Sequence, residues 1–199
     1  HIEDGHLNDI IHAAVKEAYD VAYLRKSIVK DPLFERVNTK DNTPAIIHVD
    51  LIAGDQLRIH ITAKGFGSEN MSALKMLTPA DGLKGAKEFI LHTVKHAGPN
   101  ACPPMVVGIG VGGTMDQAAW LAKRSLFREI GDRNPNPDYA DLEIELLQTI
   151  NELGIGPQGL GGKTTALDVF IEYFPTHIAG LPVAVNINCH MTRHRQVTL

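Results

Sequence analysis

The chain contains two cysteines, and each lies at an abrupt junction between a loop and an expected strand. Cys102 precedes the apolar run that begins at Met105, and Cys189 follows the one that ends at Asn188. Reactive or metal-ligating thiolates occupy partly exposed junctions of this kind, near backbone donors and cations. Positive charge is available beside Cys189 from Arg193, His194 and Arg195. Both cysteines are therefore candidates for chemistry, provided that the fold brings them together.

Two simpler interpretations of the cysteines stay open on the residues alone. A free cysteine is often only a small buried hydrophobe, and two reduced thiols are expected in a chain of this size. Cys189-His190 with His194 also contains the residue types that ligate zinc. Neither cysteine, however, belongs to the Cys-x-x-Cys pair that is typical of structural zinc sites.

Two glycine-rich segments resemble nucleotide-binding motifs. Gly108–Gly113 satisfies the dinucleotide fingerprint, and Asp132 lies about 20 residues further on, as the ribose-binding acid should. That acid should end a second strand, yet the region 127–136 is charged and unlike a strand. Gly162-Lys163-Thr164 resembles a phosphate-binding loop, but Pro157 occupies the position of its first glycine. A non-enzymatic nucleotide-binding module remains the alternative from a different functional class.

The remaining pattern indicates one α+β domain over 1–199, with a mixed sheet and flanking helices. Helical periodicity predicts helices over 7–22, 78–97, 115–127 and 139–153. Apolar runs predict strands over 105–109, 165–174 and 181–188. Alternating residues over 44–63, interrupted by the turn 53–56, predict a hairpin, and 64–68 is expected to be a glycine-bearing loop.

Composition narrows the range of partners. Acidic residues exceed basic ones for a net charge of −4, which gives no electrostatic argument for nucleic acid or an anionic membrane. The longest apolar runs are too short to span a bilayer, and no secretory signal opens the chain. A cytoplasmic location is the resulting expectation.

Five motifs taken together resemble one family across essentially the whole chain, the alpha part of class I fumarases and L-tartrate dehydratases. They are Lys64–Met71, Asn100–Pro104, Gly154–Gly159, Pro175–Pro182 and Asn188–His190. The resemblance implies a hydro-lyase that uses a 4Fe-4S cluster, which three cysteines hold while one iron polarises the substrate hydroxyl.

By this resemblance Cys102 and Cys189 are two of the three cluster ligands. The family's first ligand belongs to a Cys-Gln-Asp-Thr-Gly motif, which this sequence does not contain. The chain opens at His1 rather than Met, so an absent N-terminal segment is the expectation. The acid of that motif would then also lie outside the chain, which leaves the catalytic residues themselves unassigned.

The resemblance also implies how a dicarboxylate substrate is bound. Arg25 matches a carboxylate-binding arginine, Gly65 and Gly67 match a backbone contact to substrate, and His177 matches a substrate-contacting histidine. Arg suits a planar carboxylate because its guanidinium donates in a bidentate fork. The family's proposed base and further cations lie in a beta part, so a beta subunit or C-terminal domain, in a dimer of heterodimers, is expected as partner.

Fumarate is the substrate that the local sequence favours. Ser68–Met71 and Cys189–His194 resemble the fumarase branch, in which the enzyme hydrates fumarate to malate in the tricarboxylic acid cycle. An L-tartrate dehydratase alpha subunit is the alternative within the family.

Overall fold

A computed structural model of the chain describes residues 5–199. Contacts divide the chain into two compact units, His1–Asp55 and Gln56–Leu199, and each is described by itself. Helices and a mixed sheet occur in the second unit, so the predicted α+β class is confirmed.

The first unit is built on helix α1, Leu7–Val21, which confirms the helix predicted there. A loop follows, closed by an isolated bridge between Val29 and Asn38. The Asp31 carboxylate organises the loop by accepting hydrogen bonds from the amides of Phe34 and Glu35, at 2.5 and 2.7 Å. No residue of α1 is buried, so this unit contributes little to the core.

The predicted hairpin over 44–63 is wrong. Its first half contains no strand, while its second half forms β1, Arg58–Thr62. The partner of β1 is β6, His194–Thr198, in an antiparallel ribbon that places Thr62 opposite His194. Local alternation identified the strand correctly but could not identify a partner about 130 residues away in sequence.

The second unit is centred on a four-stranded sheet with the order β2-β5-β3-β4. The strands are β2 Ala73–Leu77, β3 Met105–Gly112, β4 Ala166–Phe174 and β5 Leu181–Asn188. β5 runs antiparallel to both β2 and β3, whereas β3 and β4 are parallel. Three of these strands were predicted. β2 was not, because its short sequence carries Lys75 between apolar residues and lacks a clear run.

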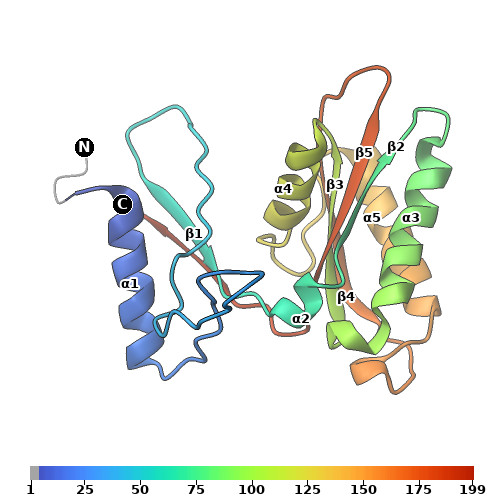
Figure 1. Cartoon of the computed structure of the whole chain (residues 1–199). Helices are drawn as coiled ribbons and strands as arrows, with labels where there is room; N and C mark the ends of the chain where they lie inside the picture. The colour runs from blue at the N-terminus through green and yellow to red at the C-terminus, as the bar shows by residue number, and fades with distance from the viewer. Residues whose placement is uncertain (1–4) are drawn as a thin grey trace. The chain divides into compact units, whose positions relative to one another are not determined.

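Helices cover both faces of this sheet (Figure 1). α4, Met115–Ser125, packs on one face, and α3, Gly82–Ala97, and α5, Pro137–Glu152, pack on the other. The main core lies between the sheet and the α3–α5 pair. Its fully buried members include Ile90, Val94, Ile109, Ile150, Ile171 and Ile187.

Two glycines of the segment that resembles a dinucleotide-binding motif allow α4 to pack closely on the sheet. Gly108 and Gly110 lie inside β3 and face α4, where an added Cβ would lie 2.2 Å from the Ala122 carbonyl oxygen and 2.0 Å from that of Ala118. Only glycine permits so close an approach of helix to strand. The strand predicted over 105–109 extends to Gly112, so most of the fingerprint is strand, and its composition has a structural explanation that needs no nucleotide.

A buried ion pair secures the crossover that joins the parallel strands β3 and β4. Glu143, on α5, is fully buried and accepts hydrogen bonds from Arg128 at 2.6 and 3.2 Å. The amides of Asn134 and Ile171 donate to the same carboxylate at 3.0 and 2.8 Å. Because every oxygen of this carboxylate is engaged, its charge is compensated, as burial requires.

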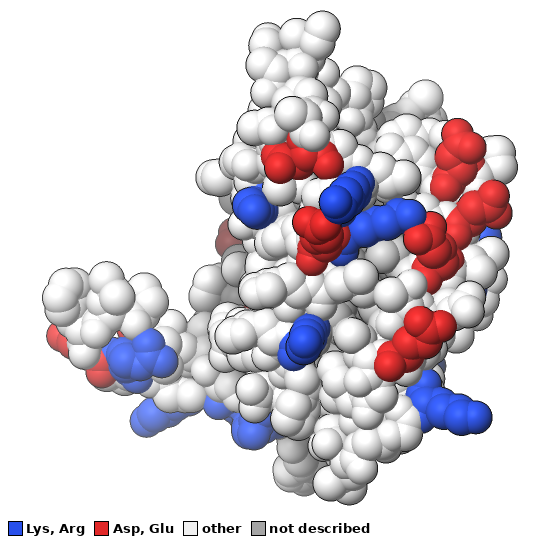
Figure 2. Space-filling model, turned by 90° about the vertical axis from the view of Figure 1, so that its right-hand side faces the viewer, with Lys and Arg blue, Asp and Glu red and all other residues white. Residues whose placement is uncertain are grey.

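Charged side chains of both signs lie on the face that includes α3 and α5 (Figure 2). Figure 2 shows acidic and basic side chains scattered over the face that includes α3 and α5, with uncharged surface between them. None of the helices within residues 5–199 is long and apolar enough to cross a membrane.

Candidate active site

The fold brings the two cysteines to the same edge of the sheet. β3 begins shortly after Cys102, and Cys189 follows the last residue of β5. The strands are antiparallel with Val106 opposite Asn188, so the start of one meets the end of the other. The antiparallel pairing of β3 with β5 thus brings Cys102 and Cys189 to the same end of the strands, although they lie far apart in the sequence.

Cys102 ends a short turn whose backbone presents the side chain outward. The 3₁₀ helix η1, Gly98–Ala101, buries Ala101 and ends at Cys102, which has φ 53° and ψ 60°. This left-handed conformation is uncommon for a residue with a side chain and persists where neighbouring structure enforces it. The Cys102 amide donates to Pro99 at 3.0 Å, and its thiol is free and exposed.

Direct hydrogen bonds join the two cysteine segments. The amide of His190 donates to the carbonyl oxygen of Cys102 at 3.3 Å, and the His190 ring nitrogen Nδ1 lies 3.0 Å from the same oxygen. A carbonyl only accepts, so a hydrogen bond here requires the tautomer that carries the proton on Nδ1. Gln158 also contacts the segment after Cys102. Its backbone amide and its side chain both donate to the Pro103 carbonyl oxygen, at 2.8 and 3.1 Å.

The glycine loop of the Lys64–Met71 motif lies against both segments. A Cβ added at Gly65 would lie 3.8 Å from the Cys189 sulfur, and one at Gly67 would lie 3.8 Å from the Asn100 carbonyl oxygen. Gly65 therefore leaves its backbone bare beside the thiol. The predicted loop is only partly irregular, since Phe66–Glu69 forms a single helical turn, α2, that begins after Gly65.

Beneath this loop lies a cluster of three charged side chains, the Glu69 cluster, formed by Lys64, Glu69 and Lys123. The Glu69 carboxylate lies 2.8 Å from the Lys64 ammonium and 2.6 Å from that of Lys123. Burial tends to raise the pKa of Glu69, but the hydrogen bonds and charges of the two lysines outweigh it and lower the pKa to about 2. Burial lowers the pKa of Lys64, and pairing with Glu69 opposes that effect.

The structure does not bring all the predicted substrate residues together. Arg25 belongs to the first unit, where its side chain is exposed and pairs with no carboxylate of residues 5–199. An unpaired guanidinium is free to bind an anion. Its predicted role remains a prediction.

His177 and the two cysteines lie at opposite ends of the sheet strands. It belongs to the loop between the end of β4 and the start of β5, whereas Cys189 follows the other end of β5. An eight-residue strand spans about 26 Å. His177 instead lines an apolar cavity of about 460 Å³ between α3 and α5. Within this chain His177 therefore lies away from the two cysteines, and its predicted contact with substrate stays a prediction.

The zinc interpretation finds no support in the arrangement of its residues. The His190 ring binds the Cys102 carbonyl, and the His194 ring lies 3.2 Å from the Glu129 carboxylate, so the two rings serve different partners. Within residues 5–199 no three side chains of His, Cys, Asp or Glu are grouped as metal ligands.

Several residues that shape this site were not predicted. His190, Gln158, Lys64 and Glu69 lie inside the motifs and Lys123 lies outside them, and nothing in their spacing indicates mutual contact. The sequence did contain one signal, which is closeness to the predicted site residues. Lys64, Glu69 and His190 each lie within five positions of one of them.

The chain matches a family model and several named relatives. The family model described as fumarate hydratase matches residues 1–198. The chain is 49% identical over 186 residues to "Putative L(+)-tartrate dehydratase subunit alpha" of Methanocaldococcus jannaschii, covering 92% of this chain and 65% of that protein. It is 37% identical over 199 residues to L(+)-tartrate dehydratase subunit alpha of Escherichia coli strain UTI89, covering 98% of this chain and 64% of that protein.

These matches show the family of the chain and how much of each relative the chain covers. The chain spans slightly less than two thirds of the length of each of the two relatives, whereas the family model matches nearly all of the chain. The chain belongs to the fumarate hydratase family of hydro-lyases.

Proposed function

We propose that this chain is the alpha part of an iron–sulfur hydro-lyase that reversibly adds water to fumarate to form malate. One observation carries the proposal. Two free thiols from distant parts of the sequence lie at one edge of the sheet, joined through the His190–Cys102 hydrogen bond, with the bare backbone of Gly65 beside one of them. Family membership supplies the reaction class.

The residues at this edge fit a 4Fe-4S cluster as two of its ligands. Cysteine thiolates hold such clusters, and Cys102 and Cys189 are both unpaired and accessible. When bound, the cluster would supply a Lewis acid for the substrate's hydroxyl group. The remaining ligand would come from outside this chain.

The chain's own residues would bind and orient the dicarboxylate. Gly65 and Gly67 lack side chains, so their backbone can approach a substrate held beside Cys189. The exposed guanidinium of Arg25 offers a bidentate fork for a carboxylate.

A second substrate is favoured by a specific observation. The relatives at 49% and 37% identity carry the name L(+)-tartrate dehydratase. Removal of water from L(+)-tartrate uses the same type of C–O cleavage, so the same edge would serve either reaction. Fumarate remains the first proposal because Ser68–Met71 and Cys189–His194 resemble the fumarase branch.

Both relatives are named as alpha subunits, and we propose that a beta subunit completes the enzyme. The test is anaerobic reconstitution of the complete alpha subunit with iron and sulfide, with and without its beta subunit. Fumarate hydration and L(+)-tartrate dehydration would be measured side by side. The expected result is fumarate turnover only with both subunits, and a preference for tartrate would select the second candidate. Lack of activity on both substrates in a cluster-loaded complex would contradict the proposal.

A further inference from the structure

The carboxylate of Glu69 joins three separate elements of the fold. It lies 2.6 Å from Lys123 of α4 and 2.8 Å from Lys64 before α2, and it accepts a hydrogen bond at 3.3 Å from the side-chain Nδ2 of Asn186 on β5. Only 24% of its side chain is exposed. The Lys87–Glu145 pair connects only two helices, and its carboxylate side chain is 55% exposed, whereas Glu69 is held from three directions.

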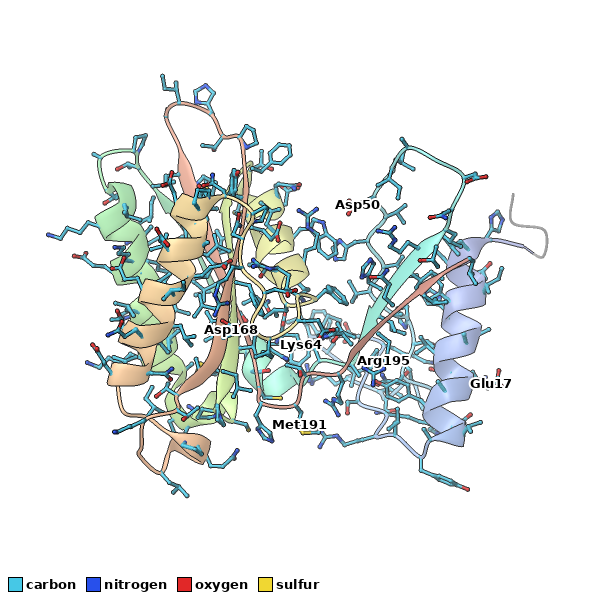
Figure 3. All side chains as sticks on the ribbon, turned by 180° about the vertical axis from the view of Figure 1, so that it is seen from behind. Glu17, Asp50, Lys64, Asp168, Met191 and Arg195 are labelled. Carbon is cyan, nitrogen blue, oxygen red and sulfur yellow. The ribbon has the colours of Figure 1, made fainter. Side chains whose placement is uncertain are left out.

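Lys64 extends this connection to the cysteine. Its ammonium donates to the carbonyl oxygen of Ile187 at 2.6 Å, two residues before Cys189, and its side chain is 12% exposed. Figure 3 shows Lys64 beside α2, and Met191 on the loop that follows β5. The glycine loop is closed from its other side by Ser68, whose hydroxyl donates to the Gly65 carbonyl oxygen at 2.9 Å.

Such a cluster is a poor way to gain stability alone. Moving a charged group out of water costs several kcal/mol per ion. The attraction between the paired ions offsets this cost only when their geometry is good. Replacement by apolar residues is often neutral or stabilising, so a half-buried ion cluster is better explained by a geometric requirement. Here the geometry that it fixes is the distance of the glycine loop from the end of β5.

We propose that Glu69 is a positioning residue that holds the Gly65–Gly67 backbone against Cys189 and Asn100, with Lys64 and Lys123 as its two anchors. Glu69 itself does not touch the substrate. Its effect on substrate binding rests on the proposed function, whereas its effect on the loop does not.

Four variants of the complete alpha subunit test this inference: Glu69→Gln, Lys123→Met, Lys123→Arg and the control Glu145→Gln. Glu145 forms the exposed pair with Lys87 on the far side of the fold from Lys123. In the metal-free protein, iodoacetamide alkylation of Cys189 is measured by peptide mapping, with Cys102 as internal reference. Hydrogen exchange of the amides over 65–70 is measured in parallel.

Loss of positioning should raise the alkylation rate of Cys189 relative to Cys102, and the exchange rate over 65–70, by about tenfold in Glu69→Gln and in Lys123→Met. A purely electrostatic effect on the thiol would instead have opposite signs, since one variant removes a negative charge and the other a positive one. Lys123→Arg should restore near-normal values because a guanidinium also pairs with a carboxylate, and Glu145→Gln should match the unaltered protein.

In the cluster-loaded complex, the same two variants should raise KM for the substrate by about tenfold, with a smaller change in kcat. Unchanged exchange and alkylation in Lys123→Met would overturn the inference, even if Glu69→Gln fails to fold. So would equal increases at both cysteines, which indicate general loosening. Normal loop behaviour of the unaltered protein without any hydro-lyase activity would instead count against the proposed function alone.

Discussion

The His190 amide donates a hydrogen bond to the Cys102 carbonyl oxygen at 3.3 Å, which couples the residue after one cysteine to the backbone of the other. The His190 ring reinforces this contact at 3.0 Å. The His190 side chain thus contacts the backbone of Cys102 rather than its thiol. The distance between the thiols is therefore set by local hydrogen bonds as well as by the pairing of β3 with β5.

Cys102→Ser and Cys189→Ser should each abolish stable cluster binding while leaving the fold intact. Serine matches cysteine in size but is a poor ligand for iron, and neither thiol is part of the core. The measurement is iron and acid-labile sulfide per protein after anaerobic reconstitution, with circular dichroism to monitor folding. Full iron content in either variant would remove that cysteine from the ligand set.

Arg25→Lys should reduce kcat/KM of the assembled enzyme by on the order of 10²-fold, or about 2.7 kcal/mol, because lysine cannot reproduce the bidentate fork. Melting temperature and cluster content should stay nearly unchanged, since Arg25 is exposed and makes no ion pair within residues 5–199. Arg36→Lys, an exposed arginine of the same unit, serves as the matched control. A loss of thermal stability with normal efficiency would show that Arg25 is structural.

Removal of the buried carboxylate of Glu143 should destabilise the fold strongly. Glu143→Ala leaves Arg128 without its partner and orphans the amides of Asn134 and Ile171. Breaking a buried pair in this way costs roughly 3–5 kcal/mol of unfolding free energy. Glu145→Ala, two positions along α5, removes an exposed ion pair and should cost no more than about 1 kcal/mol. Denaturant unfolding of both variants checks the difference, and equal losses would contradict the account.

Sequence periodicity was sufficient for much of the fold. β5 is an almost continuous buried run, β4 is buried over 168–171, and α1 and α5 carry regular apolar stripes, so their local sequences are enough to predict them. The β1–β6 pairing was missed because strand partners depend on tertiary structure, and a hairpin is the default expectation for two neighbouring strands. Local pattern therefore identified strands better than their partners.

The same division applies to the site. Cys102 and Cys189 were identified from their junctions and from family resemblance, and the sheet then placed them at one edge. The Glu69 cluster was missed because Lys64, Glu69 and Lys123 look like ordinary surface charges in sequence. Only the packing of α4 and α2 near β5 buries them together.

The stability that Glu69 contributes should depend on pH in a defined direction. Its pKa falls from an ordinary value of 4.5 to about 2 in the folded protein, where burial is outweighed by the two lysines. A carboxyl group with a depressed folded pKa stabilises the fold above its unfolded pKa, and that contribution is lost as pH falls toward the folded pKa. The difference in unfolding free energy between the unaltered protein and Glu69→Gln should therefore be constant above about pH 5. It should shrink between about pH 4.5 and 2.

Chemical denaturation across this range provides the measurement, with Glu145→Gln as the comparison expected to show a far smaller change. A difference that persists unchanged at pH 2 would mean that Glu69 acts through its shape and hydrogen bonds rather than through its charge.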